Sequence, residues 1–258
     1  MQMNKNRIIR LQDNWSLDNS PVEFVSSLTV KIRWERLKRI FARLIMDNCR
    51  SGCRILDIGS GDGDIFTRIA AIEPRYMAIE PSLAMIERFK AKSGNFICRA
   101  FGERIPFKDR VFDAVILSSV LDHGYEPRLI LQEAERILVP GGKMFFLLAN
   151  DGAWYKRLFK EHNRMRKTAS VDHNFFFSGK DLQNLLRENK LKLIIIKHFD
   201  FLRLPLGLEE FLMKVFPSRI LDSGVSLSDK LLVSIFPGAG GSFICAAAKL
   251  DNDRRQPA

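Results

Sequence analysis

The chain has 258 residues, of which 46% are hydrophobic, with 41 lysines and arginines, 30 aspartates and glutamates and four cysteines. A chain of this length and composition can bury a core of its own, which excludes a mainly disordered protein and a scaffold that depends on disulfides. The net charge of +11 is uneven, because residues 1–50, 51–150 and 151–258 carry +5, 0 and +6. The basic excess therefore lies in the two flanks and not in the middle.

Residues 1–50 form the first predicted unit, an N-terminal helical segment. They open with scattered charges and contain no apolar run of signal-peptide length. From Val30 to about Asn48, apolar side chains recur every three or four positions, which is typical of an amphipathic helix. Ser51 and Gly52 are expected to end that helix.

The four cysteines match no zinc-binding spacing, and no metal site is predicted. They are expected to be reduced thiols that pack as small hydrophobic side chains, which favours a cytoplasmic location. They are Cys49, Cys53, Cys98 and Cys245.

Residues 51–150 form the second predicted unit, in which short apolar runs alternate with amphipathic helices. This alternation is typical of a parallel sheet buried on both faces. The expected strands are 53–59, 76–80, 96–102, 112–119 and 140–150, and the expected helices are 63–72, 81–93 and 126–138.

The first strand of this unit runs into a turn in which Gly59, Gly61 and Gly63 alternate with other residues. Glycines let the backbone take unusual torsions and let a ligand lie against the main chain. Glu80 closes the next strand, 23 residues after Asp57, where a carboxylate can accept both hydroxyls of a ribose. A nucleoside-bearing cofactor is therefore expected.

The acidic residues of the turn indicate which kind of cofactor it binds. Asp64 stands where the dinucleotide-binding pattern has its third glycine. Asp57, Asp62 and Asp64 together crowd the turn with negative charge, which suits a cationic ligand without phosphate better than NAD.

Residues 151–258 form the third predicted unit, which supplies the acceptor side. Its expected elements are a basic segment at 154–167, a helix at 178–189, a strand at 191–199, an apolar insertion at 201–217 and a last strand at 242–249. Leu231 to Ala248 has no charged residue, but Pro237 and the glycines after it predict a helix end, a turn and a strand instead of a membrane span.

Five motifs in this order resemble the class I S-adenosylmethionine-dependent methyltransferases of the type 11 group, which includes quinone-biosynthesis methyltransferases. The resemblance covers about residues 50–150 and implies S-adenosylmethionine as the cofactor. The motifs are LDIGSGDG at 56–63, the acidic Glu80, GERIPF at 102–107, FDAV at 112–115 and RILVPGG at 136–142.

The resemblance also implies a role for each cofactor-binding position. Gly59, Ser60 and Gly61 would hold the amino-acid part, with Asp57 binding its ammonium directly or through water. Glu80 would bind the ribose. Around the adenine and beside the methyl donor the resemblance implies Pro81, Phe101, Gly102, Glu103 and Ser118; the family often has Asp where Phe101 stands, so stacking is expected to replace that contact.

Asp122 and His123 follow the fourth strand, where ligands of open α/β sheets bind. His123 is the best candidate for a general base, and the alternative is that the two residues cap the next helix or pair with each other. A base is needed only for hydroxyl or phenol acceptors, because methyl transfer from a sulfonium depends chiefly on alignment. His173, followed by aromatic residues, is a further candidate for the acceptor pocket; otherwise it belongs to a surface loop.

The expected fold is α/β, a Rossmann-like doubly wound seven-stranded sheet with six roughly parallel strands and an antiparallel last strand. An N-terminal helix is expected over the cofactor, and a helical insertion before the last strand. The expected function is methyl transfer to a small-molecule, lipid-linked or glycan acceptor. An RNA methyltransferase and a non-catalytic scaffold that binds S-adenosylmethionine are the alternatives.

The basic stretches at 31–43 and 156–167 are expected first of all to be solvated helix faces. Beyond that, they favour an amphiphilic or anionic acceptor and peripheral contact with the inner face of the membrane. Nucleic acid is favoured less, because no RNA-binding module is visible. Nothing in the sequence indicates the oligomeric state.

Overall fold

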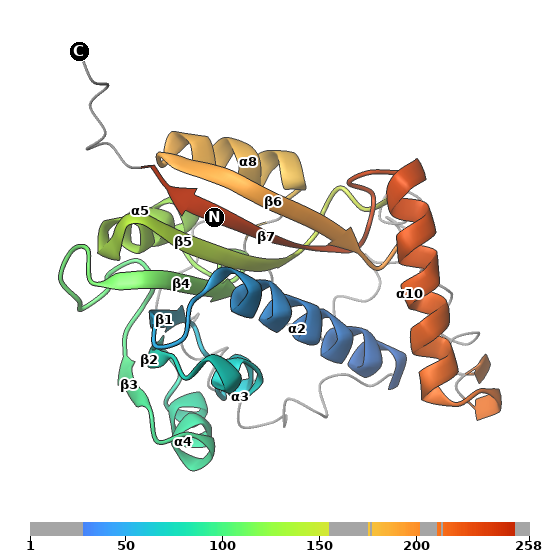
Figure 1. The fold of residues 1–258 in the computed structure, drawn as a ribbon, viewed down its shortest axis with the longest axis horizontal. Coiled ribbons are helices and arrows are strands. Elements are labelled where there is room, and N and C mark those ends of the chain that lie inside the picture. The colour runs from blue at the N-terminus through green and yellow to red at the C-terminus, as the bar shows by residue number, and fades with distance from the viewer. Residues whose placement is uncertain (1–27, 155–174, 176, 202–210, 213, 251–258) are drawn as a thin grey trace.

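The computed structural model describes residues 28–154, 175, 177–201, 211–212 and 214–250 (Figure 1). Its centre is a seven-stranded sheet in the order β3-β2-β1-β4-β5-β7-β6. The strands are β1 (Arg54–Ile58), β2 (Arg75–Glu80), β3 (Phe96–Arg99), β4 (Phe112–Ser118), β5 (Leu138–Ala149), β6 (Leu191–Phe199) and β7 (Ser242–Lys249).

The sheet is parallel except at its last strand. The pairs from β3 through β5 are parallel, whereas β7 lies between β5 and β6 and runs antiparallel to both. This confirms the predicted seven-stranded doubly wound fold with a reversed last strand. The order of the strands reverses between β1 and β4, so the crevice in which such sheets bind ligands opens at the carboxyl ends of these two strands.

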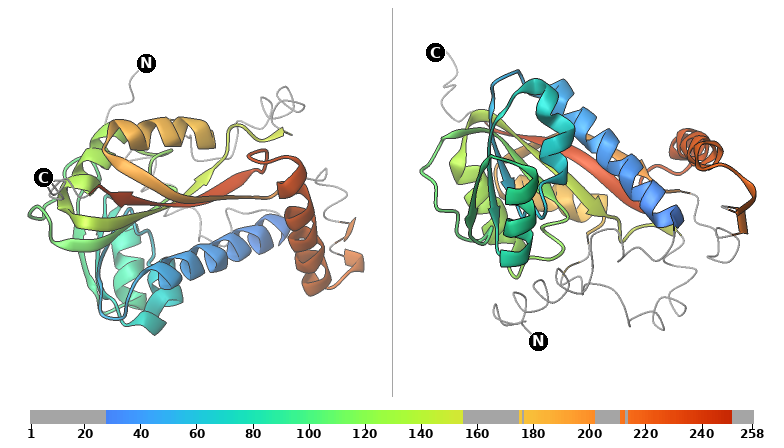
Figure 2. Two further views of the ribbon diagram at one scale, coloured as in Figure 1. Left: turned by 45° about the horizontal axis from the view of Figure 1, so that its top comes forward. Right: turned by 90° about the horizontal axis from the view of Figure 1, so that it is seen from below.

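Helices cover both faces of the sheet (Figure 2). Each face has its own buried core, and the apolar sides of the helices form one half of each. One face carries α2 (Leu28–Asn48), α3 (Asp64–Ile69), the short η1 (Ala70–Ile72) and α4 (Leu83–Lys92), and the other carries α5 (Pro127–Ile137) and α8 (Gly179–Glu188).

Helix α2, which was expected over the cofactor, packs along the face of the sheet. Leu37, Phe41 and Ile45 are buried in the core that it shares with β1, β4 and β5. Its contact with the glycine-rich turn is polar: Lys38 Nζ lies 2.8 Å from Asp64 Oδ2 at the start of α3. The helix therefore braces the turn from the side.

The predicted helical insertion is present as α10 (Ser218–Ile235), which is followed by a turn and β7. The end of β6 and the start of β7 lie next to each other. The Gly241 N–H, just before β7, donates to the Asp200 carbonyl, just after β6, at 3.2 Å. The Ser242 hydroxyl adds a bond of 3.1 Å to Asp200 Oδ2. Within the described ranges, no helix is long and apolar enough to span a bilayer.

Candidate active site

The turn after β1 is shaped by glycines in the left-handed region. Gly59 and Gly61 have φ of +65° and +55°, conformations that other residues adopt with strain. A Cβ on Gly59 would lie 2.8 Å from Val120 Cγ2, so this glycine lets the loop after β4 approach. A Cβ on Gly61 would meet no atom of the described residues within 4 Å. The main chain at Gly61 therefore borders open space in which a ligand can lie.

Glu80 at the end of β2 holds this turn from the neighbouring strand. Its Oε2 accepts a 3.0 Å hydrogen bond from the Gly61 N–H, and its Oε1 accepts one of 3.0 Å from the Ser82 N–H. The side chain is only 6% exposed. Because each carboxylate oxygen has two lone pairs, these backbone bonds leave acceptor capacity for a ligand hydroxyl at the crevice.

Asp57 lies beneath the turn and is 1% exposed. Its Oδ2 accepts a hydrogen bond from the Tyr76 hydroxyl. Asp57 Oδ1 and the Ser60 hydroxyl are buried and have no hydrogen-bond partner in the described part of the chain. Two orphaned acceptors next to an open glycine fit a ligand that brings N–H donors and positive charge, as the amino-acid part of S-adenosylmethionine does.

Burial sets the charge state of Asp57. Removal from water raises the pKa of Asp57 from 3.8 to about 7, the Tyr76 hydroxyl lowers it in part, and the nearby Glu80 raises it. The same environment holds the pKa of Tyr76 well above 10. A buried carboxylate that titrates near neutral pH is typical of a functional site, and a bound cation would stabilise its ionised form.

The variant Asp57→Asn is expected to stabilise the free protein at pH 8, because it removes a buried charge and keeps an acceptor for Tyr76. The raised pKa stabilises the wild type below pH 3.8, and this contribution is lost as pH rises through about 7. The gain at pH 8 should be on the order of 2 kcal/mol, or about 4–8 °C in Tm, and should shrink at pH 5. Thermal unfolding at both pH values measures it, and equal gains would contradict the assignment.

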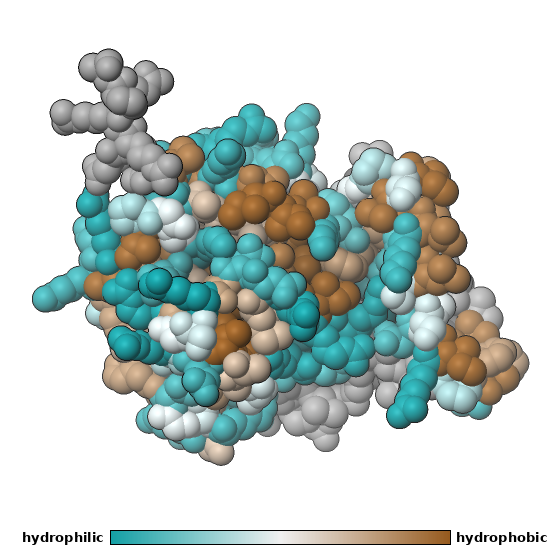
Figure 3. Space-filling view, in the orientation of Figure 1, coloured by the Kyte–Doolittle hydropathy of each residue, from teal (hydrophilic) through white to brown (hydrophobic). Residues whose placement is uncertain are grey.

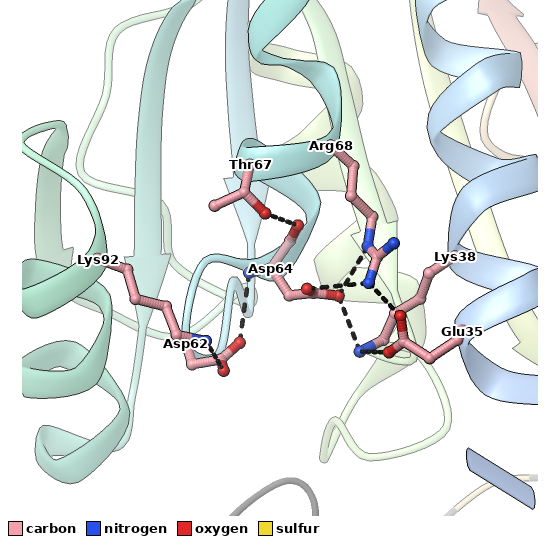
Figure 4. Close-up of polar contacts among 7 residues, drawn as sticks. All are labelled: Glu35, Lys38, Asp62, Asp64, Thr67, Arg68 and Lys92. Carbon is pink, nitrogen blue, oxygen red and sulfur yellow. Dashed lines mark hydrogen bonds and ion pairs between the residues drawn. The ribbon is translucent and has the colours of Figure 1, made fainter. Parts of the chain in front are cut away.

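The expected negative potential of the turn is corrected by the structure. Asp62 pairs with Lys92 of α4, and Asp64 pairs with Lys38 of α2 and with Arg68 of α3 (Figure 4). These cations come from sequence positions up to 30 residues away, so the turn itself gives no sign of them. The charges of Asp62 and Asp64 are therefore already paired within the protein.

The segment after β3, predicted to frame the adenine, is fixed to the loop before α5. Glu103 Oε1 accepts from the backbone N–H of Tyr125 at 2.9 Å and of Glu126 at 3.3 Å. A Cβ on Gly102 would lie 3.0 Å from Ile58 Cγ2, so the glycine allows close packing against β1. Glu103 thus holds the loop before α5, and its contact with the adenine stays a prediction.

Three other predicted residues lie at or just after the carboxyl ends of β2, β3 and β4. Phe101 is half-buried beside Gly102, and the Pro81 carbonyl accepts a 2.9 Å bond from Arg99 Nε. Ser118 ends β4 and is followed by Ser119 at φ +53°, which turns the chain toward the crevice.

Asp122 and His123 lie in the turn that follows β4, so the structure brings them to the predicted edge. Asp122 is buried, and its Oδ2 lies 4.0 Å from His123 Nε2, the outer limit of an ion pair. The Phe175 N–H donates to the Asp122 carbonyl at 3.2 Å, and Phe175 stacks on Phe177 with ring centroids 6.4 Å apart. An aromatic pair therefore lies beside this turn. His173 falls outside the described residues.

Comparison with known proteins agrees with this geometry. A family model described as a methyltransferase domain matches residues 30–195. An uncharacterized protein of Methanocaldococcus jannaschii is 30% identical over 52% of this chain and 62% of its own length. The ubiquinone/menaquinone biosynthesis C-methyltransferase UbiE of Rubrivivax gelatinosus is 28% identical over 47% of this chain and 49% of its own. The chain thus spans about half to three fifths of the length of these relatives.

Solved structures share the fold at low identity. A possible histamine N-methyltransferase of Thermotoga maritima has a TM-score of 0.59 at 19% identity, over 94% of this chain and 99% of that chain. A chain in the complex of a methyltransferase with the Trm112 activator of Haloferax volcanii has a TM-score of 0.61 at 16% identity, over 92% and 97% of the two chains.

Proposed function

The chain belongs to the S-adenosylmethionine-dependent methyltransferases, and from this premise we propose that it methylates a small, amphiphilic acceptor. S-adenosylmethionine supplies an electrophilic methyl group on a sulfonium, so the protein needs chiefly to bind and align the reactants. The relatives named for ubiquinone and menaquinone biosynthesis support an apolar ring system as acceptor.

The observation that carries the proposal is the open main chain at Gly61 between two buried acids. The Gly61 N–H is held by Glu80, and the side chain of Asp57 has one buried oxygen without a described protein partner. Glu80 would bind the ribose, and Asp57 with Ser60 would receive the ammonium. A buried carboxylate attracts a cation more strongly than one in water, because the effective dielectric constant is lower.

The acceptor side is supported by the residues that meet at the end of β4. Phe177 is buried against the core, and Phe175 is attached to the turn of Asp122. Their rings give this turn an apolar neighbour, which suits an aromatic or lipid-linked acceptor better than a nucleic-acid strand. His123 would take the acceptor proton where the nucleophile is a hydroxyl or a phenol.

Two measurements test the proposed function. Isothermal titration should show binding of S-adenosylmethionine to the full chain, and no binding would overturn the cofactor assignment. A tritium-methyl transfer assay on fractionated cell extract should label the lipid or small-molecule pool. Label in the RNA or protein pool would show that the acceptor is a nucleic acid or a protein and would overturn the proposed acceptor class. Cofactor binding without transfer to any pool would indicate a non-catalytic scaffold.

His123→Asn is expected to lower kcat about 100-fold for an acceptor that must lose a proton, because general-base catalysis commonly contributes that much. The Kd of S-adenosylmethionine should stay within about twofold, since His123 lies at the acceptor side of the crevice. Steady-state kinetics with the labelled acceptor, at several pH values, measure this. A kcat equal to that of the wild type would show that the aligned acceptor reacts without a base.

A further inference from the structure

The outer side of α10 carries apolar side chains where a surface helix normally carries polar ones. Ile220, Leu227, Leu231 and Ile235 follow one another at helical spacings of seven, four and four residues. We call these four residues the apolar stripe. Their side chains are between 56% and 64% exposed, and Phe211, Phe216 and Phe236 extend the exposed apolar surface at both ends.

The opposite side of α10 turns its acidic residues toward the protein. Asp229 is 4% exposed, and its Oδ2 accepts a 2.7 Å hydrogen bond from Arg36 of α2. Its two oxygens also accept from the backbone N–H groups of Asp200 at 3.3 Å and Phe201 at 3.0 Å. A rotation of α10 would leave the buried charge of Asp229 without its partner, which is strongly unfavourable. The ion pair therefore fixes the apolar stripe outward.

The charges around the apolar stripe are of one sign. Lys214, Arg219 and Lys230 are exposed, and among the described residues of 211–236 every exposed charged side chain is positive. The second acid of α10, Asp222, is partly buried and pairs with Arg39 of α2 at 3.1 Å. The helix thus presents an apolar surface bordered by cations.

We propose that this side of α10 docks the protein on the surface of an anionic lipid bilayer. An apolar stripe with flanking lysines and arginines is the pattern of helices that lie in the plane of a membrane interface. Figure 3 shows apolar side chains over α10 at the right of the molecule, and further apolar patches over the sheet. A second copy of the chain fits less well, because a two-fold contact through the stripe would bring like charges together.

Docking of α10 goes beyond the proposed methyl transfer, because it needs neither cofactor nor acceptor. Vesicle flotation of the full chain measures it with phosphatidylcholine vesicles, with and without phosphatidylglycerol. Binding to the mixed vesicles and weak binding to the neutral ones are expected. Absence of binding to both, or equal binding to both, would overturn the proposal.

Two variants locate the contact. Leu227→Ser with Leu231→Ser should lower the vesicle partition coefficient at least about tenfold, because two inserted leucines are lost. Arg219→Glu with Lys230→Glu should weaken binding to the anionic vesicles selectively and leaves the apolar stripe intact. Leu129→Ser is the matched control, because Leu129 is also exposed but lies on α5, at the opposite end of the molecule.

Three results would decide against the membrane. Wild-type binding by the leucine variant, with an unchanged Tm, would place the contact elsewhere. If Arg219→Glu with Lys230→Glu still preferred anionic over neutral vesicles as the wild type does, these cations would have no part in binding. A stable dimer in sedimentation that the leucine variant splits would make the apolar stripe a subunit interface.

Discussion

Replacing Glu80 by alanine is expected to weaken S-adenosylmethionine binding at least about 100-fold. The carboxylate is proposed to hold two ribose hydroxyls, and charge-assisted hydrogen bonds contribute about 1.5 kcal/mol or more each. The loss has a second cause, since Glu80 also holds the N–H groups of Gly61 and Ser82 in place. Titration calorimetry of the variant against the wild type measures the change in Kd.

Two further variants separate these causes. Glu80→Gln keeps one carbonyl acceptor and should fall between the wild type and the alanine variant. Gly61→Arg leaves Glu80 in place but fills the open space at the turn and demands a left-handed arginine, so it should abolish binding. An alanine variant that binds within about threefold of the wild type would remove Glu80 from the site.

Replacing Arg36 by alanine is expected to destabilise the protein by about 3 kcal/mol or more. The change leaves the buried Asp229 without its cation. Removing one partner of a buried ion pair lowers the free energy of unfolding far more than losing a surface pair does. For a chain of this size the loss corresponds to about 6–12 °C in Tm. Thermal unfolding measures it.

Arg39→Ala is the matched control for Arg36→Ala. Arg39 lies on the same helix and also pairs with an aspartate of α10, but its side chain is 59% exposed. The control should cost less than about 1 kcal/mol. Combining Arg36→Ala with Asp229→Asn should restore part of the loss. Equal effects of the two arginine variants would show that the buried pair does not anchor α10.

Local patterns in the sequence predict most of the fold. The apolar runs that became β1, β4 and β5 are short and bounded by glycine or polar residues, and the helices between them have clear apolar sides. Even the reversed last strand was predicted at its observed bounds, Ser242–Lys249. Helix boundaries differ from the predicted ones where a capping residue sets the helix start. The Ser82 side chain caps α4 by accepting from the Met85 N–H, so the helix begins at Leu83 and not at the predicted Pro81.

The sequence does not predict which residues far apart in the chain come into contact. The pair of Arg36 and Asp229 joins positions 193 residues apart, and the pair of Lys92 and Asp62 joins two elements. The sequence predicts Tyr76 only as a strand residue, whereas in the structure its hydroxyl donates a hydrogen bond to the buried Asp57. One sequence signal points to this contact: a tyrosine hydroxyl in an otherwise apolar strand needs a hydrogen-bond partner, and the neighbouring strand carries an aspartate.

The closure of β6 against β7 at Asp200 and Gly241 has a consequence for the chain that connects these two strands. The two strands already pair along their full length, and the intervening chain returns to the residue from which it departs. The pairing of β6 with β7 therefore does not require a fixed length of the chain between them, whereas Asp229 of that chain is tied to Arg36 and to the backbone at the end of β6. Changes in the length of the connecting chain away from Asp229 can thus be absorbed outside the sheet, without shifting the strands that carry the glycine-rich turn.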